Sequence, residues 1–575
     1  MAGGGRESGT IMDRRRNLLC AMLAVMLATA LLIPLSGLLP NGGTQHNTAA
    51  EMYELFEAFG EPDIRVEPML DIETVWAIED ARSEAEEELV SAMRCGEDEM
   101  GYDAETRTFY CTLGMRGEAD WPELSLLAKG TAEGVRVAWT DDYACDAPTD
   151  AIREGYRYEL MAYTQDQYAY IGVVFTGLPI VTIHLGEDAV LGDDYIPARV
   201  CVSADGYEPV RSAAQVHLRG GDGEYLDGDK WNYRVEFHGL TAGGKDAKRA
   251  LSVLGMEADS DWMLHGNARD TTCLRNHLCW QMWNAWNEGT PCFTPLGSEM
   301  VELFVQDAYT GVYQLMPRIR PEQELARMGG DPQKDSVLRM IGAYRVTKRP
   351  VSRITDPLGG CVELRSKPDW MSEEQAFSLL ETYVQLNLPK GAAGALDDAA
   401  FSQTAAEWVE IEPMMRYELF MQVCSLARDN IWNNLYIWVQ KKGGGYTYML
   451  SPWDMDCGLR PLFSDDTPSF NLWMVLPTRM LELNVADCRS VLWRIWDEQR
   501  ATVVSDDAVY QWIQEMEDLL NDSGAYPRES ERWRGERCAL NMAEVSAYMV
   551  DHMREIEFQM REIWAPVQGE EETGD

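Results

Sequence analysis

The sequence has few basic residues for its length. Its 575 residues include 50 Lys and Arg against 95 Asp and Glu, which gives a formal net charge of −45. Nucleic-acid binding needs clustered Lys and Arg that neutralise phosphates, so this balance argues against a nucleic-acid partner. It is typical of a solvated acidic surface, and it is also compatible with acidic sites that gather divalent cations.

The sequence also lacks the spacings of a zinc site. Its 13 cysteines are scattered singly, without a C-x-x-C pair, and its seven histidines, His265 among them, form no close ligand pair. A zinc site is therefore not expected. Cys111 with Cys145, or Cys273 with Cys292, could pair in an oxidising compartment, and buried free thiols are the alternative.

A long uncharged run lies near the N-terminus. Residues 18–39 carry no charge and follow three consecutive arginines at 14–16. A run of this length spans a bilayer as a helix, and the arginines predict that residues 1–17 stay in the cytoplasm. A cleaved signal peptide is the alternative. In either case the chain from residue 41 on is expected to be extracytoplasmic, on the cell membrane or secreted.

The next two segments differ in composition. Residues 40–93 read as an acidic linker, and DARSEAEEELVSAMR (80–94) looks helical. In residues 94–175, short runs rich in Tyr, Val and Thr alternate with Gly and Asp turns, which predicts a small β-sandwich. No site signature appears there, so this domain is expected to support, space or bind rather than catalyse.

Two hairpins are predicted farther along. Residues 213–240 read as two strands around a polar Gly/Asp loop, with Lys230 entering the second strand. Such an arrangement holds phosphates in several nucleotide sites, although RGGDG matches no phosphate-loop fingerprint and a lone lysine is usually a surface residue. Residues 301–319 predict a second hairpin that turns at 307–311.

Helices are predicted between and after these hairpins. Residues 268–286 form a helix that Asp270 or Thr271 could cap, with Arg275 in or near its first turns. Toward the C-terminus, residues 540–564 carry a helical stripe of methionines, which indicates core packing. The acidic tail, residues 566–575, is expected to be disordered.

A hydrophobic hairpin with carboxylates at both ends is predicted at residues 428–456, which read RDNIWNNLYIWVQKKGGGYTYMLSPWDMD. Buried carboxylates are costly unless they are paired, hydrogen-bonded or bound to a metal. If the hairpin closes at its Gly-rich turn, Asn434 meets Asp454 at the open end, beside Asp429. Asp454 and Asp456 share a face if the strand continues that far. Oxygen ligands of this kind suit Mg²⁺ or Mn²⁺.

The spacing is also that of a kinase catalytic loop. Asp429-x-x-x-x-Asn434 follows a helix and precedes a hairpin that ends in a further aspartate, although the HRD histidine and the DFG triplet are missing. In protein kinases the first aspartate accepts the proton of the substrate hydroxyl, and the asparagine and the later aspartate hold the metal ions.

The chain resembles the CotH family, named for spore coat protein H, whose members resemble atypical secreted protein kinases. The segments that carry the resemblance are GLPIVTIHL, LRG followed by KWNYRVEF, ARDTTCLRN, TGVYQL, ARDNIWNN and SPWDMDCG, in this order over roughly residues 176–565. The resemblance implies an α+β fold, in which a kinase-like domain follows the small β-sandwich and the transmembrane helix.

The resemblance also implies roles for individual residues. Asp429 corresponds to the catalytic aspartate, and the metal ligands are Asn434 and Asp454, with Asp456 a second acidic candidate. Lys230 corresponds to the lysine that contacts the ATP phosphates. Its replacement by alanine is expected to weaken binding of ATP and to leave the melting point of the unliganded protein nearly unchanged. A weaker candidate on the phosphate side is Arg275.

The implied activity is phosphorylation of extracytoplasmic, envelope or spore-coat proteins with ATP and Mg²⁺ or Mn²⁺. Two departures concern this activity: Pro317 stands where the family usually has a glutamate, and RGGDG replaces a loop that often reads RGNSS. The alternative is therefore a weakly active or inactive kinase-shaped surface scaffold. A protein that binds glycan or protein through its β domain is a third class.

Overall fold

The structure is a computed structural model. It describes residues 62–114, 122–127, 131–140, 148–186, 188–219, 230–241, 245–268, 270, 272–292, 297–341, 353–355, 361–426, 434–456, 458–459, 475–533 and 542–565. The predicted membrane segment at 18–39 and the acidic tail lie outside these ranges. Within them, no helix combines the length and the apolar character that crossing a bilayer requires. Helices and strands are mixed, which confirms the α+β class.

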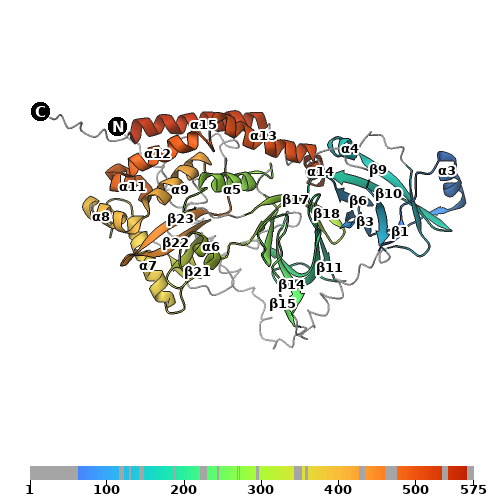
Figure 1. Ribbon diagram of the computed structural model, residues 1–575, viewed down its shortest axis with the longest axis horizontal. Helices are drawn as coiled ribbons and strands as arrows, with labels where there is room; N and C mark the ends of the chain where they lie inside the picture. The colour runs from blue at the N-terminus through green and yellow to red at the C-terminus, as the bar shows by residue number, and fades with distance from the viewer. Residues whose placement is uncertain are drawn as a thin grey trace, which may run out of the picture. The chain divides into compact units, whose positions relative to one another are not determined.

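Two sheets form the first part of the described chain (Figure 1). One has the strand order β1-β7-β3-β4, and the other has the order β5-β6-β10-β9-β8, with β2 beside β10. The elements are β1 (Pro62–Arg65), α3 (Ile72–Ala81), β2 (Ser83–Glu84), β3 (Met93–Cys95), β4 (Asp98–Glu99), β5 (Gly101–Asp103), β6 (Thr108–Thr112), β7 (Leu124–Leu127), β8 (Arg136–Trp139), α4 (Pro148–Glu154), β9 (Arg157–Tyr163) and β10 (Gln167–Thr176). Met93 and Leu126 of one sheet share a hydrophobic core with Phe109 and Leu160 of the other. The sheets include β1, so they begin before residue 94.

The helix predicted at 80–94 is wrong. The helix of this region is α3, which ends at Ala81. Beyond it, Ser83–Glu84 pair with β10 as strand β2, and Leu89 and Val90 are buried in the core between the sheets. Tertiary packing therefore outweighs the helical propensity of the glutamate-rich segment.

The predicted cysteine pairs are also wrong. Cys111 is bonded to Cys95 rather than to Cys145, which lies outside the described residues. Strand β3 supplies one half of this disulfide and strand β6 the other, so the bond joins the two sheets. Cys273 and Cys292 are both free and buried, which was the alternative.

The second part is a closed barrel of seven strands with an eighth at its side. The order is β13-β12-β11-β17-β18-β16-β14-β15, and β13 also pairs with β14, which closes the ring. The strands are β11 (Ile180–Leu185), β12 (Ile196–Ser203), β13 (Val210–Arg219), β14 (Asn232–Leu240), β15 (Asp246–Lys248), β16 (Asp261–His265), β17 (Glu299–Val305) and β18 (Ala308–Pro317). The hairpin of β13 and β14 is the pair of strands predicted on either side of the Gly/Asp loop. Because side chains alternate along a strand, Val235 and Phe237 of β14 fill the barrel. By the same alternation, Arg234 and Glu236 of β14 lie on the outer face of the barrel.

The second predicted hairpin is present with a shifted turn. Its two strands, β17 and β18, are joined at Gln306 and Asp307, both of which have positive φ angles. Gly311 lies inside β18, where the register with β17 shifts. The turn predicted at 307–311 is therefore placed too late in the chain.

The third part combines a five-stranded sheet with most of the helices. The sheet has the order β20-β21-β19-β22-β23, built from β19 (Ser336–Ile341), β20 (Arg353–Thr355), β21 (Cys361–Ser366), β22 (Leu435–Lys442) and β23 (Gly445–Pro452). The helices are α5 (Arg275–Trp286), α6 (Pro321–Arg327), α7 (Glu373–Leu386), α8 (Asp398–Trp408), α9 (Ile411–Val423), α11 (Val475–Leu483), η2 (Val485–Asp487), α12 (Cys488–Arg500), α13 (Asp506–Asp522), α14 (Ala525–Arg532) and α15 (Met542–Ile563). Figure 1 shows α9 beside the hairpin of β22 and β23. Met549, Met553 and Met560 of α15 are buried, as expected for a stripe that packs in the core.

Candidate functional site

The hairpin of β22 and β23 closes in the predicted register. Leu435 is opposite Pro452, and the backbone amide of Trp453 donates to the carbonyl oxygen of Asn434 at 2.7 Å. Asn434 therefore lies next to the segment that leads into Asp454. Strand β23 ends at Pro452, so the idea that Asp454 and Asp456 share a strand face is wrong. Asp454 instead has a φ of 54°, a left-handed conformation that turns the chain after Trp453.

The turn brings three side chains together. His265, Asp454 and Asp456 each offer one ligand atom, and these atoms all lie within 4.8 Å of one another. His265 ends strand β16 of the barrel, and its Nε2 lies 3.3 Å from Asp454 Oδ1. Its Nδ1 is 2.9 Å from Asn267 Oδ1. Although no close histidine pair exists in the sequence, one histidine therefore joins the two predicted carboxylates.

Charges around Asp454 favour its ionised form. Burial by itself would raise the pKa of Asp454, but the hydrogen bond and charge of His265, with Arg219 and Arg339, hold that pKa well below its usual range. Both guanidinium groups also lie over the ring of Trp453, at 5.7 Å for Arg219 and 5.8 Å for Arg339. Burial and the neighbouring Arg339 lower the pKa of Arg219 to about 10. The acidic centre is thus bordered by cations that could face phosphate oxygens.

The donor set fits a hard divalent ion. Two carboxylates are the ligands that Mg²⁺ and Mn²⁺ prefer, and an imidazole is a more common ligand of softer metals. Asp454 and Asp456 would hold such an ion, and the amide of Asn434 is the further ligand predicted from the sequence. His265 would act mainly as the partner that orients Asp454.

Lys230 lies in a fully buried ion pair. Its Nζ donates to Glu529 Oε1 at 2.7 Å, neither side chain is exposed, and the Lys230 nitrogen lies 4.8 Å from the centre of the Tyr313 ring. Glu529 also accepts from the backbone amide of Val312 at 2.8 Å. Gly311 leaves space for this contact, because a Cβ there would lie 2.2 Å from Glu529 Oε2. The carboxylate beside the lysine therefore comes from helix α14.

The residue before Glu529 links α14 to the first part of the chain. Arg528 donates to both carboxylate oxygens of Glu302, at 2.8 and 2.7 Å, and to Thr176 Oγ1 at 2.7 Å. Thr176 is the last residue of β10. Two consecutive residues of one helix thus bind the two-sheet part, the barrel and Lys230.

Helix α5 and the residues before it contact the segment that carries Asp454 and Asp456. The helix predicted at 268–286 begins only at Arg275, and its N-cap is Leu274, so the predicted cap at Asp270 is wrong and Thr271 lies outside the described residues. Asp270 nevertheless accepts from the backbone amide of Arg275 at 2.8 Å. The Arg275 side chain binds Asp270 at 2.8 Å and the carbonyl of Gly458 at 3.3 Å. Asn276 Oδ1 accepts from the amide of Met455 at 2.8 Å, between the two aspartates. These contacts place Arg275 where it orders the chain after Asp456, and its role toward phosphate stays a prediction.

Asp429 lies outside the described residues, and described residues before and after it make hydrogen bonds. On the N-terminal side, the Nε2 of His552 in α15 lies 2.8 Å from the carbonyl oxygen of Gln422 and 3.1 Å from Ser425 Oγ. On the C-terminal side, Asn434 is bound to Trp453.

The buried pair changes what is expected of a Lys230 variant. The sequence suggested that Lys230→Ala would leave the unliganded melting point nearly unchanged. This substitution, however, leaves the buried carboxylate of Glu529 without its charged partner. We expect Lys230→Ala or Glu529→Gln to lower the free energy of unfolding by roughly 3–5 kcal/mol. The double variant Lys230→Met/Glu529→Met should recover part of that loss, because neither charge remains buried. Chemical denaturation of the full chain measures all three changes.

Lys334→Ala is the matched control, since this lysine is exposed and pairs with Asp331 at the surface. It should change the denaturation midpoint little. If the single variants at Lys230 or Glu529 unfold at the same denaturant concentration as this control, the buried pair does not stabilise the fold.

The comparison with known families agrees with the sequence segments and with this geometry. A family described as CotH kinase protein matches residues 216–556, which include the end of β13, Lys230, the acidic hairpin and most of α15. No curated protein matches the chain. The resemblance inferred from the motifs is thereby confirmed, and the chain belongs to the CotH kinase family.

Proposed function

We propose that the protein is an ATP-dependent protein kinase that acts outside the cytoplasm. The observation that carries the proposal is the meeting of Asp454 and Asp456 with His265, at the open end of the hairpin that follows Asp429 and Asn434. A kinase-like order of residues in the sequence is thus matched by a compact acidic centre in the fold. The family assignment supports a kinase-like activity of this kind.

In the proposed reaction, the hydroxyl oxygen of an acceptor protein attacks the γ-phosphorus of ATP. The bond between that phosphorus and the bridging oxygen of ADP breaks, and Asp429 takes the hydroxyl proton. A bound Mg²⁺ or Mn²⁺ would supply positive charge to the phosphates. Lys230, held by Glu529, would orient them, and Arg219 and Arg339 border the same centre.

Glu529 favours catalysis over a pure scaffold. The scaffold alternative rested on Pro317, which replaces the family's usual glutamate. Pro317 lies at the end of β18, opposite Trp262, and has no carboxylate to offer. Lys230 nevertheless has a carboxylate partner in Glu529, so the absence of that glutamate does not leave the lysine unpaired.

The extracytoplasmic location rests on two features. The disulfide between Cys95 and Cys111 is typical of an oxidising compartment, and the uncharged run at 18–39 would anchor or export the chain. We therefore propose acceptor proteins of the cell envelope or of a spore layer, with no nucleic-acid partner.

Binding of ATP tests the proposal before any acceptor is known. ATP with Mg²⁺ or Mn²⁺ should raise the melting temperature of the full chain, because ligand at about 100 times its Kd adds roughly 2.7 kcal/mol of stability. ATP with a chelator should give a smaller shift. Incubation with labelled ATP, alone and with envelope proteins, then tests transfer. The absence of any shift at millimolar ATP with either metal would favour the scaffold.

A further inference from the structure

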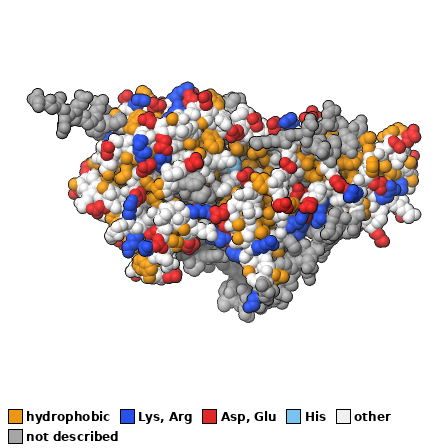
Figure 2. All heavy atoms as spheres, in the orientation of Figure 1, with side chains coloured by type: hydrophobic (Ala, Val, Ile, Leu, Met, Phe, Trp, Pro, Cys, Tyr) orange, Lys and Arg blue, Asp and Glu red, His pale blue; other side chains and the backbone are white. Residues whose placement is uncertain are grey.

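A polar cavity lies apart from the acidic centre. Its volume is about 470 Å³, and it is bounded on one side by the barrel and on the other by β21 and the start of α6. Seven of its ten lining residues are charged, and four of these are the cations Lys248, Arg318, Arg320 and Arg365. Basic side chains (blue) are also visible in the space-filling view near the middle of the face shown, although acidic residues predominate in the chain as a whole (Figure 2).

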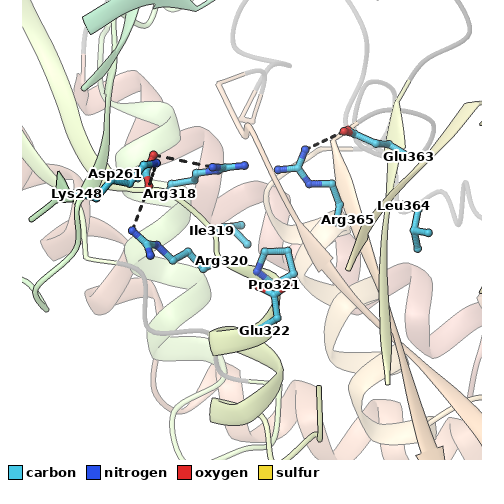
Figure 3. Close-up of a pocket in the computed structure, with 10 residues that line it drawn as sticks. All are labelled: Lys248, Asp261, Arg318, Ile319, Arg320, Pro321, Glu322, Glu363, Leu364 and Arg365. Atoms are coloured by element: carbon cyan, nitrogen blue, oxygen red, sulfur yellow. Dashed lines mark hydrogen bonds and ion pairs between the residues drawn. The ribbon is translucent and has the colours of Figure 1, made fainter. Parts of the chain in front are cut away.

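Two guanidinium groups face each other across this cavity. Arg318 follows β18 on the barrel side and Arg365 belongs to β21 on the other side, and their side chains point toward one another (Figure 3). Arg365 is paired with Glu363 at 3.0 Å. The ion pair of Arg318 is longer, 4.0 Å from its Nη1 to Asp261 Oδ1.

Asp261 is shared too widely to neutralise Arg318. It lies 2.6 Å from Arg234, 3.2 Å from Lys248 and 3.2 Å from Arg320. Burial, followed by the charges of Arg234 and Arg365, lowers the pKa of Arg318. The Arg318 side chain therefore lies in a positive local potential while remaining 36% exposed. Two like charges that approach across a solvent-filled space attract an anion between them, and arginine binds phosphate through two parallel hydrogen bonds.

The cavity lies at a fixed distance from the acidic centre. Asp261 and His265 are the first and last residues of β16, so these two residues are four positions apart along one strand. At about 3.3 Å per residue, this corresponds to roughly 13 Å. An extended acceptor chain with its hydroxyl at the acidic centre would reach the cavity with a residue about four positions away.

We propose that this cavity binds the phosphate group of an acceptor residue that is already phosphorylated, about four residues from the next hydroxyl to be modified. The inference rests on the proposed function. A phosphate carries up to two negative charges and several acceptor oxygens, which matches two opposed guanidinium groups better than a single carboxylate does. One round of transfer would thus create the ligand for the next.

Direct binding tests the cavity without any transfer. The probe is O-phosphoserine, with serine as the uncharged control, titrated into the full chain and into the double variant Arg318→Gln/Arg365→Gln. Phosphoserine should bind the unmodified protein saturably, and the double variant should bind it at least roughly tenfold more weakly. Arg494→Gln is the matched control, because Arg494 is an exposed arginine of α12 that pairs with Glu412. It should bind like the unmodified protein.

Three further readouts separate the outcomes. The single variant Arg318→Gln, at a partly exposed position, should also bind phosphoserine more weakly if the double variant does not fold. Equal binding of phosphoserine by Arg318→Gln and by the Arg494 control would overturn the proposal. The shift in melting temperature with ATP and Mg²⁺ should survive in the Arg318 variant; its loss there would assign the cavity to the nucleotide phosphates. Failure of the kinase proposal has a different signature, namely no ATP shift in the unmodified protein while phosphoserine still binds.

Discussion

Asp454→Asn should abolish phosphoryl transfer and remove the dependence of ATP binding on Mg²⁺ or Mn²⁺. The substitution keeps the size of the side chain but replaces a charged oxygen ligand with a neutral one. It also removes the negative charge that His265 faces at 3.3 Å. The melting temperature, measured with ATP in the presence and absence of each metal ion, gives the binding result, and labelled ATP gives the transfer result.

Asp456→Asn serves as the comparison within the same cluster. Its carboxylate oxygen lies within 4.8 Å of the ring nitrogen of His265 and the carboxylate oxygen of Asp454, so partial loss of the metal dependence is expected. A folded Asp454→Asn protein that still shows the full metal-dependent shift would exclude this carboxylate as a ligand. The acidic centre would then be structural.

Asp429→Asn should separate catalysis from binding. If Asp429 takes the proton of the acceptor hydroxyl, its replacement by asparagine lowers the transfer rate by roughly 100- to 10,000-fold. The metal-dependent ATP shift should remain, because Asp454 and Asp456 are unchanged. Rates of transfer from labelled ATP, taken alongside melting temperatures, measure both effects on one preparation.

Asn430, the next residue in the sequence, offers a control for general disturbance of this segment. Asn430→Ala should retain transfer far better than Asp429→Asn. Transfer that survives in folded proteins carrying Asp429→Asn and Asp454→Asn would move the chemistry to another part of the chain.

The hairpin could be predicted from the sequence because its contacts are local. Alternating side chains and a Gly-rich turn define the register, so the neighbours Asn434 and Trp453 follow from counting residues. The disulfide could not be found in this way, since Cys95 and Cys111 meet only when two sheets pack on each other. For the same reason, glutamate-rich residues 80–94 suggested a helix that core packing does not allow.

The site residues that could not be predicted from the sequence are those that lie far along the chain from their partners. His265 ends a barrel strand, and nothing in its immediate sequence distinguishes it from a histidine in an ordinary turn. Glu529 lies 299 residues from Lys230, and its neighbours predict only a polar helix. Its carboxylate reaches the lysine because Gly311 has no side chain and because Arg528 fixes α14 against Glu302. No local pattern encodes these conditions.

The pairing of Lys230 with Glu529 has a consequence for synthesis of the protein. The ribosome makes the lysine 299 residues before its partner, which at about 5–20 residues per second is a delay of roughly 15–60 s. During that interval the strands of the barrel and the acidic hairpin have been synthesised, but Glu529, whose carboxylate neutralises Lys230, has not. A nascent chain that has not yet reached α14 therefore cannot bury this lysine favourably. Under the proposed function, activity would begin only after helix α14 has been synthesised.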